Sequence, residues 1–204
     1  QNIIIVKGEE METILPNGMQ VDLLAFGMDK GQHPKPRRSL DDRFKEIKDM
    51  GAIIGADHPF HKDGVGPFLE ENPEYLFKLD FLEVHNGECA LWIPGYAKAN
   101  EKAQHFFDKV SDENPSLKET LGKLVSSDGH SLYEIGQTWM NLPGLDLTSR
   151  VSIVDSLRRG MIYAAKQNLQ DKRSNNYLGA MDHIAKWVYL KTARKTKSLP
   201  TGPL

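Results

Sequence analysis

Three short segments near the middle of the chain each place a carboxylate and an imidazole within a few residues of one another. They read DHPFH at residues 57–61, EVHNG at residues 83–87 and SSDGH at residues 126–130. Carboxylate and imidazole side chains are common protein ligands of divalent transition metals. Each segment follows a run of apolar residues, and strands that end in such side chains are how barrel enzymes assemble a metal site at one rim.

The expected ligands form a mixed oxygen and nitrogen set. Asp128 and His130 point the same way on an extended segment, and Gly129 between them removes side-chain obstruction. Glu10 and Glu83 accompany apolar strands, where an ionised carboxylate is costly unless a cation pairs with it. The expected metal ligands are Glu10, His58, Glu83, Asp128 and His130. This set contains no thiolate and suits Mn, Fe or Zn better than Ca.

Strands and helices are expected to alternate along the chain and to position these residues. Predicted strands cover residues 3–6, 21–26, 52–56, 81–84 and 121–125, and predicted helices cover residues 39–50, 73–79, 97–110 and 149–159. Polar residues at the strand ends and this alternation argue for an α/β fold with a parallel sheet. Glu10 is expected in the loop after the first strand, and Gly160 is expected to end the last helix.

Local signals set the boundaries of several of these elements. Residues 16–18 read PNG, which predicts a turn before the second strand. Ser39 is expected to cap the first helix, with Asp42 three residues later. Leu40, Phe44 and Ile47 would form the buried stripe of that helix.

Composition bounds the broad class of the protein. The 204 residues are 39% hydrophobic and 26% charged, which is ordinary for a globular domain. A formal net charge of −2 gives no global reason to expect nucleic acid or an anionic membrane as partner. The single Cys89 excludes an internal disulfide and fits a reducing compartment, so we expect a cytoplasmic protein. No apolar run approaches the ~20 residues of a membrane helix.

The last part of the chain, residues 166–204, has a different character. It carries eight Lys and Arg residues against two Asp residues. Leu178, Met181, Ile184, Ala185 and Val188 fall at helical spacing within it. We expect an amphipathic helix that packs back on the domain with a solvated basic face. A role at a membrane surface, or in attracting phosphate groups, is the alternative.

Four segments, in order and at similar separations, resemble the PHP (polymerase and histidinol phosphatase) family. They read KGEEME at residues 7–12, DHPF at 57–60, LEVHNG at 82–87 and SDGH at 127–130, and the similarity covers roughly residues 3–163. The resemblance implies a distorted TIM-like barrel of seven β/α units, with residues 1–165 as its C-terminal portion. It also implies two or three divalent metal ions at the strand C-termini and hydrolysis of a phosphoester by metal-activated water.

The resemblance assigns roles to individual residues. Glu10 is similar to the metal-bridging Glu of the family, His58 to the ligand in its His-Pro-Phe segment, and Asp128 with His130 to its Asp-x-His pair. Glu83 falls where some members place another ligand. The implied catalytic residues are Glu10, His58 and Asp128, and Asn86 resembles a group that supports the ligands or orients the substrate. Apart from the resemblance, the positions of His61 and Lys62 make them candidates to bind a substrate phosphate, with a solvated loop His and an ordinary exposed cation as the alternatives. The substrate would be a small phosphorylated molecule or a nucleotide end.

The chain departs from the family at its first metal-binding segment. The family opens with His-x-His, whereas the first histidine here is His33, and Asp22 stands where the family often has another His. The departure favours a chain that lacks an N-terminal segment. Either that missing segment or a second chain or copy would then pair with the edge strand expected at residues 3–6. A non-catalytic PHP-like scaffold or binding subunit is the alternative. A third hypothesis is a hydrolase of the metal-dependent amidohydrolase kind.

Overall fold

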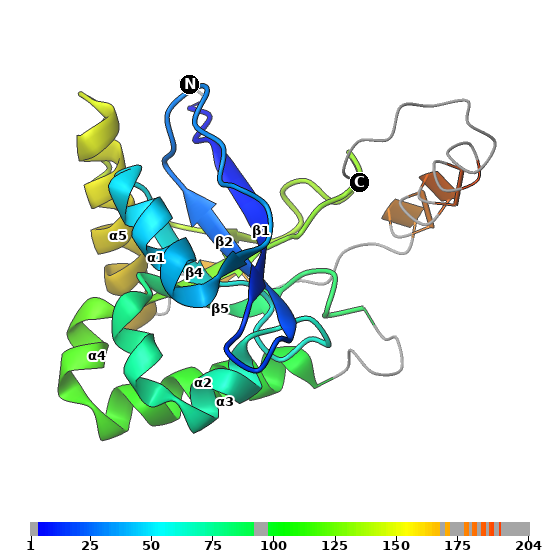
Figure 1. The fold of residues 1–204 in the computed structure, drawn as a ribbon. Helices are drawn as coiled ribbons and strands as arrows, with labels where there is room; N and C mark the ends of the chain where they lie inside the picture. Colours follow the sequence, from blue (N-terminus) through cyan, green and yellow to red (C-terminus); the bar gives the residue numbers. More distant parts are fainter. Residues whose placement is uncertain are drawn as a thin grey trace.

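The computed structural model describes residues 4–91, 98–167 and 170–171, together with scattered positions between 178 and 192. Six strands form one mixed sheet in the order β3-β1-β2-β4-β5-β6 (Figure 1). They are β1 (Gly8–Ile14), β2 (Gln20–Phe26), β3 (Arg38–Ser39), β4 (Ile53–Ala56), β5 (Phe81–Asn86) and β6 (Gly122–Ser126). The expected α/β class is confirmed, and the described strands form an open sheet rather than a closed barrel.

Helices connect the strands and follow the last one. They are α1 (Leu40–Asp49), α2 (Gly66–Glu71), α3 (Ala99–Glu113), α4 (Pro115–Thr120) and α5 (Arg150–Gln167), with a 3₁₀ helix η1 at Pro73–Lys78. A small second sheet pairs β7 (Trp139–Met140) with β8 (Gln170–Asp171). No helix among the described residues is both long and apolar enough to cross a membrane.

The sheet is only partly parallel. Strands β4, β5 and β6 run parallel to one another, but β2 is antiparallel to both β1 and β4. The prediction of a parallel sheet is therefore wrong for its first strands. The cause is the predicted turn at residues 16–18, which joins β1 and β2 as a hairpin, with Gly18 at φ +84° and its N–H donating to the Leu15 carbonyl.

The first strand begins later than its hydrophobicity suggests. A strand was expected at residues 3–6, but the described residues 4–7 form no strand and the Ile5 side chain is 91% exposed. The strand begins at Gly8, so Glu10 lies within β1 and not in a loop after it. Glu10 pairs in register with Leu24 of β2, and such partners share one face of the sheet.

The sheet is covered by helices on both faces. Helices α1 to α4 pack their apolar residues against one face, which includes Ile54 and Leu82. The neighbouring residues Ile53 and Phe81 point to the opposite face, where α5 covers them with Val154 and Met161. Consecutive strand residues alternate between faces, so both cores draw on the same strands. The result is a three-layer arrangement that leaves the strand ends free to carry functional side chains.

The first helix follows its sequence signals closely. The Ser39 hydroxyl donates to the Asp42 carboxylate at 2.9 Å and accepts from the Asp42 N–H at 3.3 Å. Leu40, Phe44 and Ile47 are buried as expected. The predicted N-cap and buried stripe are therefore confirmed.

The last long helix does not end where expected. Gly160 was predicted to stop it, but α5 continues to Gln167, two residues past the expected boundary at residue 165. Gly160 is buried, and a Cβ added there would lie 3.3 Å from Leu142 Cβ. The glycine therefore permits Leu142, which lies outside the helix, to approach α5 closely, and the prediction of a helix end is wrong.

The C-terminal helix can be followed only at some positions. The described positions between 178 and 192 are helical, but Leu178, Met181 and Val188 are exposed. The expectation that this apolar stripe packs on the domain is therefore wrong at these positions. Gly179 is buried instead, against Glu134. Ile184 and most of the predicted basic tail lie outside the described residues.

Candidate metal centre

The candidate site lies where the C-terminal ends of β4, β5 and β6 meet. Asp57 and His58 follow β4, Asn86 ends β5, and Asp128 follows β6. Glu10 reaches the same place from β1. The residues that line the resulting cavity of about 210 Å³ are Glu10, Asp22, His58, His61, Lys62, Asp63, Glu88, Cys89, Asp128 and His130.

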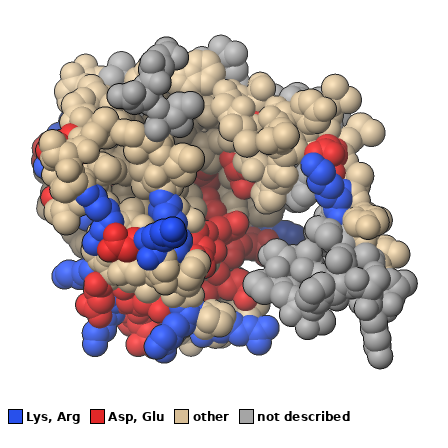
Figure 2. All heavy atoms as spheres, turned by 90° about the horizontal axis from the view of Figure 1, so that it is seen from above, with Lys and Arg blue, Asp and Glu red and all other residues tan. Residues whose placement is uncertain are grey.

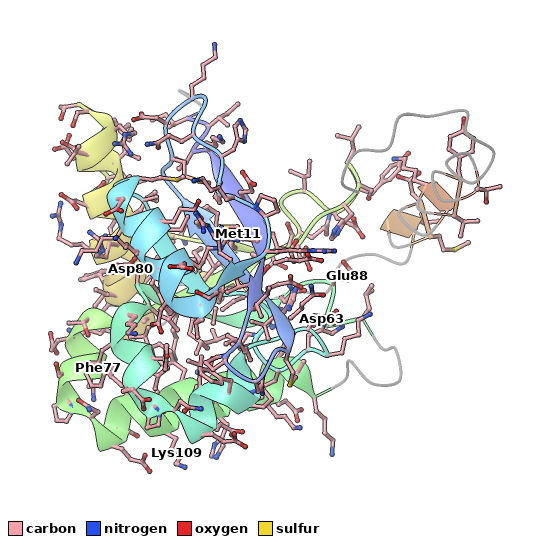
Figure 3. The ribbon with its side chains drawn as sticks, viewed as in Figure 1. Met11, Asp63, Phe77, Asp80, Glu88 and Lys109 are labelled. Carbon is pink, nitrogen blue, oxygen red and sulfur yellow. The ribbon has the colours of Figure 1, made fainter. Side chains whose placement is uncertain are left out.

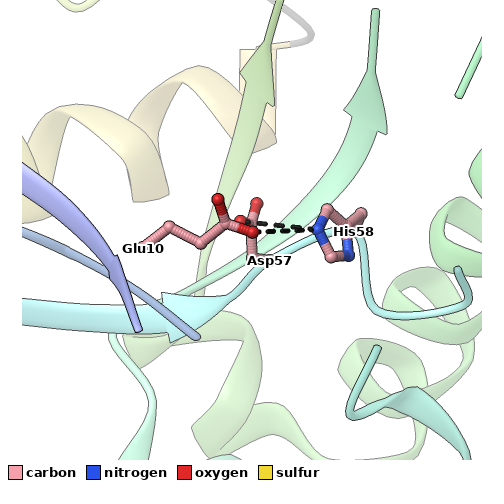
Figure 4. Close-up of side chains that lie close together, drawn as sticks. All are labelled: Glu10, Asp57 and His58. Atoms are coloured by element: carbon pink, nitrogen blue, oxygen red, sulfur yellow. Dashed lines mark hydrogen bonds and ion pairs between the residues drawn. The ribbon is translucent and has the colours of Figure 1, made fainter. Parts of the chain in front are cut away.

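A first group of candidate ligands comprises Glu10, Asp57 and His58 (Figure 4). One ligand atom from each lies within 4.8 Å of the others. His58 Nε2 is 3.3 Å from a Glu10 oxygen and 3.7 Å from an Asp57 oxygen. His58 Nδ1 is buried and finds no hydrogen-bond partner among the described residues. Two carboxylates thus converge on one imidazole, which is a geometry that can hold a metal ion.

A second group comprises Glu88, Asp128 and His130, again with ligand atoms within 4.8 Å of one another. His130 Nδ1 is 3.2 Å from a Glu88 oxygen and 3.6 Å from an Asp128 oxygen. The His130 backbone N–H donates to Glu134 at 2.8 Å, and Glu134 is fully buried. The turn that carries His130 is therefore tied to the interior.

Glu83 lies beneath the cavity, with only 1% of its surface exposed. One carboxylate oxygen accepts the His58 backbone N–H at 2.8 Å, and the other accepts the Ser126 hydroxyl at 2.5 Å. Glu83 therefore ties the end of β4 to β6. It does not belong to either group of candidate ligands.

Asn86 also lies beneath the cavity and connects the two groups. Its amide N–H₂ donates to Glu83 at 3.2 Å and to Asp128 at 3.0 Å. Its amide oxygen accepts the backbone N–H groups of Glu88 and Cys89, each at 3.0 Å. The buried Asn86 side chain therefore orients Asp128 and the turn that carries Glu88, which belong to the second group. It also contacts Glu83, which holds the His58 backbone of the first group.

Two of the site residues have backbone conformations that L-amino acids rarely adopt. His58 has φ +22° and Asp128 has φ +48°. Positive φ at a residue with a Cβ costs about 1–3 kcal/mol, and such residues concentrate at functional sites. The hydrogen bonds that Glu83 and Asn86 make to these two residues hold them in place.

Neighbouring carboxylates favour the protonated forms of His58 and His130. Burial opposes the charge on His58, but the hydrogen bond to Glu10 and the charges of Glu83 and Asp128 outweigh it and raise its pKa to about 9. The same hydrogen bond lowers the pKa of Glu10. The hydrogen bond to Glu88 raises the pKa of His130 to about 9.

The buried carboxylates are shifted in the opposite direction, toward their neutral forms. Burial, followed by the charge of Glu83, raises the pKa of Asp57 well above its ordinary value. Burial also raises the pKa of Asp128. Burial and the charge of Glu10 raise the pKa of Asp22 to about 6. The cluster therefore retains protons that a bound cation would replace.

The structure brings four of the predicted ligands together and places a fifth below them. Glu10, His58, Asp128 and His130 line the cavity, whereas Glu83 lies beneath it. Of the predicted substrate-binding residues, Asn86 is 1% exposed and lies beneath the cavity as well.

The other two predicted substrate-binding residues line the cavity. The His61 ring stands edge-on to the His58 ring, with centroids 5.1 Å apart. Burial lowers the pKa of His61, so its imidazole is neutral near pH 7. The Lys62 side chain is 72% exposed, and its ammonium lies 3.6 Å from Asp63.

Two candidate ligands were absent from the expected set. Asp57 was part of the DHPFH segment, yet only its neighbour His58 was predicted as a ligand. Glu88 lies two residues past the end of β5, within a turn that gives no ligand pattern in the sequence. The position of Asp57 directly before the predicted ligand His58 was an available signal, whereas no sequence signal points to Glu88.

The surroundings of the site are acidic. Seen from above, acidic atoms gather in a hollow near the centre of the molecule, while Lys and Arg lie mostly around its margin (Figure 2). A second cavity of about 630 Å³ shares Glu10 and Asp22 with the first and adds Glu9 and Glu12. Without a bound cation, this concentration of negative charge would repel an anionic substrate.

Comparison with protein-family models, with curated proteins and with solved structures finds no match for this chain. The geometry of the cavity and the sequence segments around it are therefore the grounds for any functional assignment.

Proposed function

We propose that the chain is a metal-dependent phosphoesterase related to the PHP family. Its substrate would be a small phosphorylated molecule or a nucleotide end. The observation that carries the proposal is the convergence of two carboxylate–imidazole groups on one cavity at the C-terminal ends of parallel strands. The proposal includes the fold of that family, with the mixed sheet as part of a distorted TIM-like barrel.

The donor atoms fit two divalent cations of the Mn, Fe or Zn kind. Each group offers two carboxylates and one imidazole, with no thiolate. The buried and unpartnered His58 Nδ1 and the raised pKa values of Asp57 and Asp128 indicate a cluster whose charges are incompletely balanced by the protein alone. A positive ion would remove this imbalance.

The two ligand groups would each hold one metal ion. Glu10, Asp57 and His58 would bind one ion, and Glu88, Asp128 and His130 would bind the other. Bound divalent ions supply charge for the phosphoryl oxygens and activate water.

Groups at the cavity mouth would help to position the substrate. Lys62 offers a positive charge to phosphoryl oxygens, and His61 offers a ring nitrogen from a partly buried position. Because the cavity is otherwise acidic, substrate binding itself should require the metal ions.

Metal analysis combined with turnover tests this proposal. Protein purified without chelator should contain bound Mn, Fe or Zn, as measured by inductively coupled plasma mass spectrometry. It should also hydrolyse p-nitrophenyl phosphate or bis(p-nitrophenyl) phosphate, and EDTA should abolish this activity. Asp128→Asn should lower kcat/KM by about 100-fold or more, since it removes a ligand charge. Asp112→Asn, at an exposed position on α3, is the matched control.

Three outcomes would separate the competing functions. Unchanged turnover in Asp128→Asn would reject the assignment of the site. Protein that has neither stoichiometric metal nor turnover would favour the non-catalytic scaffold. Cleavage of amides but not of phosphate esters would favour a hydrolase of the amidohydrolase kind.

A further inference from the structure

A separate cavity, of about 690 Å³, lies at the other end of the parallel strands. Its floor includes Ala52 and Ile54 at the start of β4, whereas the metal centre lies beyond the end of that strand. Phe77 and Asp80 mark this side of the molecule in Figure 3, and Asp63 and Glu88 mark the metal side. The two cavities share no lining residue.

Two helices form the walls of this cavity, and Arg150 fixes their separation. Arg150 is the first residue of α5, and its guanidinium donates to the carbonyls of Gly27 at 2.8 Å and Met50 at 3.1 Å. Met50 is the C-cap of α1. The same guanidinium pairs with Asp29 at 2.9 Å. The start of α5 is thereby fastened to the end of α1.

Arg158 fastens the same helix to the sheet two turns later. Its guanidinium pairs with Asp80 at 2.6 Å and with Asp155 at 3.0 Å. The other Asp80 oxygen accepts the Ile54 N–H at 2.9 Å. The walls are therefore held by a connected set of hydrogen bonds, and a preformed cavity loses little entropy when it binds a ligand.

Part of the cavity lining is apolar and lies among charged side chains. Phe44, Ile54 and Val154 are buried in its lining, and Phe77 is 54% exposed at its rim. An aromatic ring half-exposed beside a cavity offers a face on which a flat molecule can stack. The volume lies within the range of about 300–1,000 Å³ that is typical of small-molecule sites.

The charged groups around the cavity leave positive charge available. Of the acids in its lining, Asp41 pairs with Lys78 at 2.6 Å, and Asp80 and Asp155 pair with Arg158. Lys45 and Lys48 lie three residues apart on α1 and also line the cavity. Neither lysine forms an ion pair within the part of the chain that the structure describes. These two ammonium groups are free to meet an anion.

We propose that this cavity is a second ligand site, which binds a small organic anion with an apolar body about the size of one or two rings. The apolar body would lie between Phe44, Phe77 and Val154. Its carboxylate, sulfonate or phosphate group would meet Lys45 and Lys48. The site does not depend on the metal centre, because no ligand of that centre contributes to it.

The fluorescent anion 8-anilinonaphthalene-1-sulfonate is a suitable probe, since it combines an aromatic body with one sulfonate. It should bind the full-length protein with a stoichiometry of one and with unchanged affinity after EDTA treatment. The double variant K45E/K48E should bind it about tenfold more weakly, because two attractive charges become repulsive. Phe77→Ala should also weaken binding. Lys109→Glu, at an exposed position on α3, is the matched control and should bind as the parent does.

Two results would overturn the proposal. One is binding by K45E/K48E that equals binding by the K109E control. The other is loss of the signal in Leu132→Ser, because the Leu132 side chain is 85% exposed in a different part of the surface and could bind the probe instead. Far-UV circular dichroism of each variant shows whether it is folded, and a folded K45E/K48E protein that binds normally counts against the site.

Discussion

Asn100 and Asn86 exchange two hydrogen bonds. The Asn100 amide oxygen accepts the Asn86 backbone N–H at 3.0 Å, and the Asn100 amide N–H₂ donates to the Asn86 carbonyl at 2.9 Å. A side chain from the first turn of α3 thus occupies the place of a neighbouring strand at the end of β5. Because Asn86 in turn binds Asp128 and the Glu88 N–H, the position of α3 determines where both candidate ligands stand.

Replacing Asn100 should therefore weaken the candidate metal centre. In Asn100→Ala the polar backbone atoms of Asn86 lose both partners, and the free energy of unfolding should fall by about 1–3 kcal/mol. Loss of a supporting residue behind metal ligands typically weakens metal affinity by about 10–100-fold. Calorimetric titration with Mn²⁺ or Zn²⁺ measures the affinity, and urea unfolding in EDTA measures the stability.

A second asparagine provides a matched control for this variant. Asn114 caps α4, where its side chain accepts from the N–H groups of Ser116 and Leu117. Asn114→Ala should cost about 1 kcal/mol of stability while leaving metal affinity unchanged. Equal loss of metal affinity in both variants would show that Asn100 acts only through general stability.

The metal-free protein should become more stable when Asp22 is replaced by Asn. Burial, followed by the charge of Glu10, raises the pKa of Asp22 to about 6 from an ordinary value of 3.8. The fold therefore favours the protonated form, and this contribution is present below about pH 4 and lost as pH rises through 6. In EDTA, Asp22→Asn should melt at a higher temperature than the parent at pH 7 and at a similar temperature at pH 4. A difference that does not change with pH would contradict this account.

Metal binding should release protons and strengthen as pH rises toward 9. The pKa of His58 is raised to about 9, because the hydrogen bond to Glu10 and nearby carboxylate charges outweigh the effect of burial. A metal ion must displace that proton, so affinity should rise by up to tenfold per pH unit between about pH 7 and 9. Calorimetry in buffers of different ionisation enthalpy counts the protons released. Release of none would exclude His58 as a ligand.

The same shift predicts how stability depends on pH without metal. A folded-state pKa of about 9 exceeds the ordinary value of 6.5 for His58, so its contribution is full below about pH 6.5. It should be lost as pH rises through 9. His58→Asn should remove this alkaline loss of stability in EDTA, and a melting curve series from pH 6 to 9.5 would show it. An unchanged alkaline slope in this variant would assign the loss to other groups.

Arg43 should be among the most sensitive positions for stability. Its guanidinium is buried and donates to the carbonyls of Glu12 and Lys35, each at 2.9 Å, and to the Glu46 carboxylate at 2.6 Å. Arg43→Met keeps much of the volume but leaves these acceptors without their donor, and should cost about 3 kcal/mol or more. Lys45→Met on the exposed face of the same helix should change stability by only about 0.5 kcal/mol. Equal urea midpoints for the two variants would contradict this role of Arg43.

The predictable part of the site is the part that follows apolar parallel strands. Ile53 and Ile54 precede Asp57 and His58, and Leu124 and Val125 precede Asp128. Since the C-terminal ends of parallel strands meet at one edge, adjacent placement follows from the strand pattern alone. Glu88 lies outside this reasoning, because hydrogen bonds from its turn to Asn86 determine its position and leave no periodic signal.

The first strand shows why hydrophobicity alone can select the wrong segment. The apolar run at residues 3–6 is a stronger strand signal than the GEEMETI sequence of β1. Burial in β1 depends on pairing with β2, which turns only Met11 and Thr13 into the core. Gly160 shows a similar limit, because glycine is the residue type that commonly ends a helix. The contact that favours glycine here is with Leu142, which lies outside the helix, and the sequence pattern of the helix does not reveal that contact.

The left-handed backbone at His58 and Asp128 places stability and chemistry in opposition. Glycine at either position would relieve a conformational penalty of about 1–3 kcal/mol, offset in part by the greater freedom of glycine in the unfolded chain. It would also delete a candidate ligand. A library of variants selected for thermal stability alone should therefore accumulate glycine at these two positions. The variants with the highest melting temperatures should then have the lowest affinity for metal.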